Sequence, residues 1–323
     1  MILENYSGSA AAEEFVSGDH EQYMETVVGD PAELQEMTNE CVSDIHNLTV
    51  ALARFEHKCI VESAGEELLN EGIGEFFAKV KAKIVEYWNR FKAWVLKIVN
   101  KIRGSVFAPR KKWLDEKRTE LNTASFKKDA KVSIYSLMKP GKAEEAAEKL
   151  GMKAYQEAVK AAEKYSKSKQ STEELKSALE SAMMAGKKKG ESAMAYLERT
   201  YLGKEEEAKL ESGLVKQLIK IADNTFKLAD ALPGVQKIAD GMIQVADAQL
   251  KPGASDSTEA KNSKHRLAEA LNVVGPMISQ GVSAMIALNS KYNAKVMSAL
   301  ASAYSNRAGT KLGEEGSLLS AYM

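Results

Sequence analysis

The feature that most constrains the fold is a helical period of large apolar residues between Leu69 and Ile102. Side chains three or four positions apart lie on the same face of an α-helix, so residues that recur in this way form one apolar stripe. The stripe contains Leu69, Ile73, Phe76, Val80, Ile84, Trp88, Phe91, Val95, Ile98 and Ile102, and it is widened by Phe77, Val85, Trp94 and Val99. The pattern predicts one continuous amphipathic helix, with Gly104 as its C-terminal cap.

A second amphipathic helix is predicted just before it. Asp30 can cap a helix whose first position is Pro31. An apolar stripe then runs to about residue 61 and consists of Leu34, Met37, Cys41, Ile45, Leu48, Leu52, Phe55 and Cys59. The short stretch "ESAGEE" separates the two patterns, so we expect residues 30–104 to form a helical hairpin with an acidic first helix and a basic second helix.

The composition predicts helix in the rest of the chain as well. Ala, Glu, Lys, Leu and Met dominate, aromatic residues make up 7%, and there are six prolines. We therefore expect an all-α fold, an elongated helical hairpin plus a helical bundle. The expected organisation is a flexible acidic arm (1–29), the hairpin (30–104), a linker with a short helix near 112–121 (105–139), a C-terminal helical bundle (140–305) and a tail (306–323).

Local signals divide the expected bundle. Ser171 and Glu174 have the spacing of a capping box and should open a helix, while the sequence "AGKKKGES" can break it. Pro276 should kink or split the last helix. Helices are expected at about 142–168, from 171 onward, and at about 204–232, 235–250 and 258–305.

Charge is balanced overall but segregated along the chain. Residues 1–78 carry 17 acidic residues against Arg54 and Lys58, whereas residues 79–112 carry 11 basic residues against Glu86 alone. Such segregation bears on partners more than on fold. The acidic segment could shield the basic one within the chain or before assembly.

Motifs for chemistry are missing from the sequence. There is no HExxH, no GxSxG and no glycine-rich phosphate loop. Cys41, His46, His57 and Cys59 are the one group of soft ligands, but on one helix the two cysteines lie about 27 Å apart and His57 and Cys59 point to different sides. We therefore expect no catalytic residue, no metal, no cofactor and no enzymatic activity.

No segment predicts passage through a membrane. The N-terminal 40 residues lack the pattern of a signal peptide, and no run of 18 consecutive apolar residues occurs.

Three roles remain open for the basic helix. It can simply pack on neighbouring helices with its cations solvated, it can lie on an anionic membrane with its tryptophans at the interface, or it can neutralise nucleic-acid phosphates without reading sequence. The candidate contacts to DNA or to an acidic partner are Lys79, Lys81, Lys83, Arg90, Lys92, Lys97, Lys101, Arg103, Arg110, Lys111 and Lys112.

The stretch "ESAGEELLNEGIGEFFAKVKAKIVEYWNRFKAWVLKIVNKIRG" resembles the N-terminal part of internal or minor structural proteins of large tailed bacteriophages. The similarity covers about residues 60–104 and implies a virion protein, head-internal or capsid-associated, made in the bacterial cytoplasm. It also implies trimming after short motifs such as those ending at Glu62 or Glu71. Expected partners are other virion proteins or further copies of the chain, and non-specific DNA. A membrane-acting helical protein, pore-forming or injected, is the alternative, and an adaptor of the host cytoplasm is a third possibility.

Overall fold

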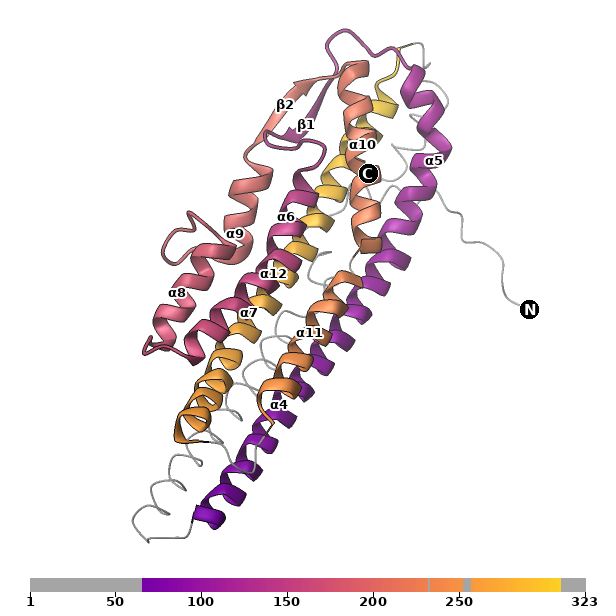
Figure 1. Cartoon of the computed structure of the whole chain (residues 1–323). Coiled ribbons are helices and arrows are strands. Elements are labelled where there is room, and N and C mark those ends of the chain that lie inside the picture. Colours follow the sequence, from indigo (N-terminus) through magenta and orange to yellow (C-terminus); the bar gives the residue numbers. More distant parts are fainter. Residues whose placement is uncertain (1–65, 232, 252–256, 309–323) are drawn as a thin grey trace, which may run out of the picture.

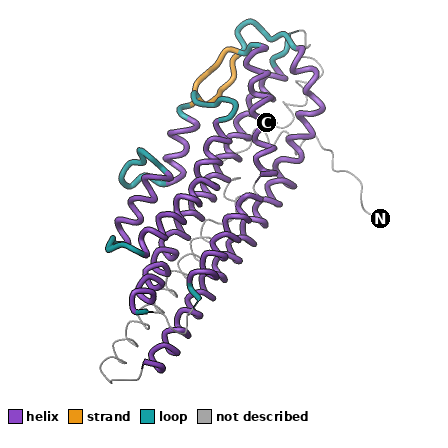
Figure 2. The backbone as a smooth tube through the Cα atoms, in the orientation of Figure 1, coloured by secondary structure: helices purple, strands orange, loops and turns teal. Residues whose placement is uncertain are grey.

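The fold is elongated and helical, as Figure 1 shows. The computed structural model describes residues 66–231, 233–251 and 257–308. The expected all-α class is confirmed, and the smooth trace in Figure 2 shows that helix dominates. The elements are α4 (Glu66–Lys101), the π-helical turn η1 (Ile102–Phe107), α5 (Ala108–Thr123), β1 (Lys131–Tyr135), α6 (Lys142–Leu150), α7 (Met152–Ser166), α8 (Thr172–Met183), α9 (Ala193–Leu197), the π-helical turn η2 (Glu198–Leu202), β2 (Glu205–Lys209), α10 (Ser212–Ala231), α11 (Pro233–Gln249) and α12 (Thr258–Ser305).

The central element is α12, whose bounds are those expected from the sequence. Its 48 residues give a length of about 72 Å, and it contacts α4, α5, α6, α7, α8, α9, α10, α11 and β1. A helix in this position is covered on most sides, which explains why most residues of its second half are buried, including the polar Asn289, Ser290 and Asn293. The helix is continuous through Pro276, so of the two expected effects, a kink or a split, the split does not occur.

The basic helix is longer than predicted. The chain stays helical without interruption from α4 through η1 into α5, so Gly104 lies inside a helical turn and does not cap one. Val106 and Phe107 are buried and extend the apolar stripe past the expected end. Pro109 follows directly on the π-helical turn η1, where the regular α-helical ladder of hydrogen bonds is already interrupted. The short helix expected near 112–121 is present within α5, whereas the linker expected between residue 104 and that helix is itself helical.

A two-stranded antiparallel sheet interrupts the helices. Strand β1 pairs with β2 so that Val132 lies opposite Ala208. We predicted a linker at the first strand and a helix from about residue 204 at the second, and both expectations are wrong there. Strand β2, EEEAK, has no apolar alternation that would distinguish it from a helix surface, and β1, KVSIY, alternates over only five residues. Their pairing joins residues 70 to 78 positions apart, from Tyr135 with Glu205 to Lys131 with Lys209, which no local pattern reports.

The helix starts follow their capping signals more closely. The Ser171 hydroxyl accepts from the Glu174 backbone N–H at 3.2 Å, and the Glu174 carboxylate accepts from the Ser171 N–H at 2.8 Å, so the predicted capping box is confirmed. The break at "AGKKKGES" is also confirmed, because α8 ends at Met183. The helix expected at 142–168 is two helices, since the backbone leaves the helical conformation at Gly151.

One cluster of buried apolar side chains connects the described elements. It runs from Val80 on α4 through the α6–α10 region to Ala303 near the end of α12. Among the described residues the core therefore has no boundary between the basic helix and the C-terminal bundle. The acidic arm, the first helix of the expected hairpin, the Cys41–Cys59 segment and residues 309–323 of the tail lie outside the described residues.

Candidate partner-binding surface

All eleven predicted contact residues lie on the continuous helical run of α4, η1 and α5. Their surroundings differ because the apolar stripe of this run is buried, which turns each cation toward a neighbouring helix, toward solvent or into the core according to its angle on the helix. The residues therefore form several groups, not one continuous face.

Two of the predicted cations bind acids of α11. Lys81 Nζ lies 3.1 Å from Asp247 Oδ1, and Lys92 Nζ lies 2.9 Å from Asp240 Oδ1. These pairs are partly exposed, so each contributes only about 0 to 1 kcal/mol to stability. The two ion pairs join α4 to α11, which lies along one side of α4. An acidic partner of the basic helix is thus part of the same chain.

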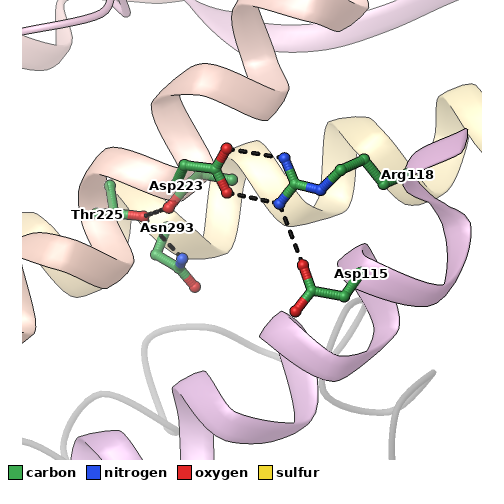
Figure 3. Close-up of polar contacts among 6 residues, drawn as sticks. Asp115, Arg118, Asp223, Thr225 and Asn293 are labelled. Carbon is green, nitrogen blue, oxygen red and sulfur yellow. Dashed lines mark hydrogen bonds and ion pairs between the residues drawn. The ribbon is translucent and has the colours of Figure 1, made fainter. Parts of the chain in front are cut away.

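Arg110 has the surroundings that differ most from the prediction. Its side chain is buried, with 5% of the residue exposed, and its guanidinium Nη1 donates to Asn293 Oδ1 at 3.0 Å. Asn293 in turn donates from Nδ2 to the Thr225 hydroxyl at 2.8 Å (Figure 3). Arg110 therefore joins α5 to α10 and α12 inside the fold, and its assignment as a DNA or acidic-partner contact is wrong.

A second arginine of α5, not among the predicted contacts, forms the best-defined ion pair. Arg118 donates from both Nη atoms to Asp223 of α10 at 2.8 and 2.7 Å, and from Nη2 to Asp115 at 3.2 Å (Figure 3). The hydrogen bonds to Asp223 raise the pKa of the guanidinium above its usual range. The spacing of Asp115 and Arg118 is a visible helical signal, whereas Asp223 is 105 positions away and could not be found from sequence.

The remaining predicted cations stay at the surface. Lys79 is exposed and pairs with Glu75 at 2.6 Å, and Lys83 pairs with Glu86 at 3.1 Å. On α4, five cations share one edge of the helix and are called here the basic stripe: Lys79, Lys83, Arg90, Lys97 and Lys101. Arg103 is half-buried in η1, and Lys111 and Lys112 are exposed on α5.

The tryptophans lie inside the fold. Trp88 is 1% exposed and Trp94 is 5% exposed, and both belong to an aromatic cluster with Tyr87 and Phe91. Trp113 is partly buried and packs edge-on against Tyr304, with ring centroids 6.0 Å apart. A folded chain thus keeps these side chains away from a membrane interface.

Helix α12 is long and apolar enough to cross a membrane, the only such helix within the described ranges. Of its most apolar window, 65% is buried inside the fold, as in the core helix of a helical bundle. No group of three or more His, Cys, Asp or Glu side chains that could hold a metal ion occurs in the part of the chain that the structure describes.

Comparison with known proteins finds no matching family, no matching curated protein and no matching solved structure.

Proposed function

We propose that the chain is a non-enzymatic structural protein of a bacteriophage particle, head-internal or capsid-associated, and that its basic helical run binds packaged DNA or an acidic partner. The resemblance of residues 60–104 supports the virion assignment. The observation that carries the binding role is the number of surface cations along one uninterrupted helical run, in the basic stripe of α4 and at Lys111 and Lys112 on α5.

A rod of this kind suits non-specific binding to a polyanion. Lysines and arginines held on a helix that is anchored by a buried stripe can approach several phosphates at once, and they carry no information about base sequence. The membrane-acting alternative requires Trp88 and Trp94 to leave the core, so no observation favours it over the first proposal.

Mass spectrometry of purified phage particles from infected cells tests the virion assignment. We expect the chain at a constant copy number per particle, resistant to high-salt washing of the particle surface. Absence from the particles contradicts the proposal. Leakage of anionic vesicles on addition of the purified chain would instead support the membrane-acting alternative.

DNA binding is tested with double-stranded DNA of arbitrary sequence at several salt concentrations. Replacing Lys111 and Lys112 by Glu should weaken binding and reduce the slope of log affinity against log salt by about 2, since each lost phosphate contact removes about 0.9 from the slope. The matched control is the pair Lys216→Glu and Lys220→Glu, two exposed lysines of α10. Equal losses of DNA affinity in the two double variants would contradict DNA binding by this helical run. An unchanged salt slope in the Lys111 and Lys112 variant would contradict it as well.

A further inference from the structure

We propose that the loop between α8 and α9 is a second binding surface for double-stranded DNA, so that one chain bridges two DNA segments. The inference rests on the proposed function, because the first segment is the one bound by the helical run of α4, η1 and α5. The loop consists of residues 184–192 and is called here the lysine loop, since it contains Lys187, Lys188 and Lys189.

The lysine loop and α5 lie on opposite sides of the molecule. In Figure 1 the loop projects from one edge of the bundle, between α8 and α9, while α5 forms the opposite edge. Both α5 and the α8–α9 segment pack against α12, which lies between them. A duplex bound at Lys111 and Lys112 of α5 therefore leaves the lysine loop open to a second duplex.

The loop is held in one conformation by contacts at its two ends. Arg199 of η2 donates to both carboxylate oxygens of Glu191, at 2.8 and 3.0 Å, and to the Gly186 carbonyl at 3.0 Å. Gly186 and Gly190 have φ values of 80° and 79°, in the left-handed region that favours glycine. Because the backbone is already ordered, less conformational entropy is lost when the loop binds a partner.

The acids beside the loop are already engaged. Lys187 donates to Glu180 of α8, and the Glu191 carboxylate is bound at the base of the loop. Lys188 and Lys189 are exposed, and neither side chain forms a hydrogen bond or an ion pair within the described residues. The loop thus presents two adjacent positive charges to solvent from a fixed backbone.

The composition of the loop favours a phosphate backbone over another protein as the partner. From Ala185 to Ser192 the sequence AGKKKGES has no large apolar and no aromatic side chain. Protein interfaces depend on such side chains as buried anchors, whereas lysines bind the phosphates of a duplex by charge alone. We therefore expect this surface to bind DNA without reading its sequence.

A DNA-bridging assay with the full-length chain tests the inference. One duplex of arbitrary sequence is fixed to beads, a second duplex carrying a fluorescent label is added, and the amount captured in the presence of the protein is measured. Binding of a single labelled duplex is measured in parallel, because that measurement reports the proposed function alone.

The test variant carries Lys188→Glu and Lys189→Glu, and circular dichroism checks that it is folded. We expect capture of the second duplex to fall by at least about tenfold, while affinity for a single duplex falls by less than about threefold, because the helical run of α4 and α5 is unchanged. The matched control carries Lys216→Glu and Lys220→Glu on α10, the same change of charge at two exposed positions outside the loop. It should retain capture.

Four results would overturn the bridging role. They are capture by the loop variant equal to that of the parent, an equal loss of capture in the control, a parent chain that binds one duplex but captures no second, and a loss of single-duplex affinity as large as the loss of capture. The last of these would mean that the loop belongs to the first surface. A parent chain that binds no duplex at all overturns both the inference and the proposed DNA contact.

Mixing two variants tests whether both surfaces must belong to one chain. The loop variant and the Lys111→Glu, Lys112→Glu variant each retain one surface, so a mixture should capture no more of the second duplex than either variant alone. Capture restored to the level of the parent would show that separate chains join the two duplexes, and it would overturn bridging by one chain.

Discussion

Arg110 and Lys111 are adjacent in the sequence and have opposite surroundings. The guanidinium of Arg110 is buried against Asn293, whereas Lys111 is exposed on α5. Neighbouring residues of a helix point about 100° apart, so a run of cations is divided between the core and the surface once the orientation of the helix is set. At the scale of residues, the position of a charge on its helix therefore matters more than its presence in a basic run.

Trp88 should be among the residues that tolerate substitution least. Its side chain is 1% exposed, and it packs edge-on against Tyr87 and Phe91. Trp88→Asp leaves a cavity and places an unpaired charge in the core, so we expect the free energy of unfolding to fall by about 3 to 5 kcal/mol. Urea unfolding followed by circular dichroism measures this. Asn89→Asp, at the exposed neighbouring position, should change the value by less than about 0.5 kcal/mol.

Tyr292 should make the free energy of unfolding depend on pH in the alkaline range. Burial raises the pKa of its phenol, whose hydroxyl donates to the Tyr201 carbonyl at 3.1 Å. A group whose pKa is raised by folding gives its full stabilisation below the pKa of the unfolded tyrosine, about 10, and loses it as the pH rises further. Tyr292→Phe should therefore be less stable by about 1 kcal/mol at neutral pH, but its stability should fall less steeply above about pH 10.

Urea unfolding at a series of pH values from about 8 to about 11 measures both effects. Tyr304→Phe is the control, because Tyr304 is only partly buried and donates to Glu120 near the surface. A wild-type stability that stays flat across this range would contradict the assignment, as would an equal change of slope in the two variants.

At the scale of elements, the small sheet depends on a turn that only glycine fits. Gly203 connects η2 to the residue before β2 and has a φ of 77°, in the left-handed region. A Cβ at this position would collide with the Ser136 side chain and approach Leu137. The turn lets the Ser136 backbone N–H donate to the Lys204 carbonyl at 2.8 Å, which continues the pairing of the two strands.

Gly203→Ala should therefore lower the free energy of unfolding by more than about 1 kcal/mol, through the unfavourable φ and the collision. Gly213→Ala is the matched control, since Gly213 lies in α10 with nothing within 4 Å of its added Cβ. We expect the control to be neutral or to stabilise by up to about 1 kcal/mol, because alanine favours helix. Thermal unfolding of the two variants gives the comparison, and equal shifts would contradict the steric argument.

At the scale of the whole molecule, a single core should make unfolding cooperative. Leu179 of α8 is buried and belongs to the same apolar cluster as the tryptophans of α4. Leu179→Ala should destabilise the chain by about 2 to 5 kcal/mol. The decrease should be the same by tryptophan fluorescence, which reports α4 and α5, and by circular dichroism, which reports all helices.

Two separate transitions, with a fluorescence midpoint unaffected by Leu179→Ala, would instead show that the basic helix and the C-terminal bundle unfold independently. Leu96→Ala serves as the control, because Leu96 is 37% exposed on α4 and its truncation should cost much less.

The sequence alone determined the helical class, the basic amphipathic helix, the capping box at Ser171 and both ends of α12, because each depends on contacts between residues a few positions apart. It could not determine that α4 continues into α5, that two five-residue segments pair as strands, or that Arg110 is buried while Asp223 binds Arg118. Those features were decided by the tertiary structure. The strand pairing and the contacts of the two arginines join residues far apart in the chain, and the helix continues past Gly104 where Val106 and Phe107 are buried in the core. The energy of each feature exists only when packing has brought the partners together.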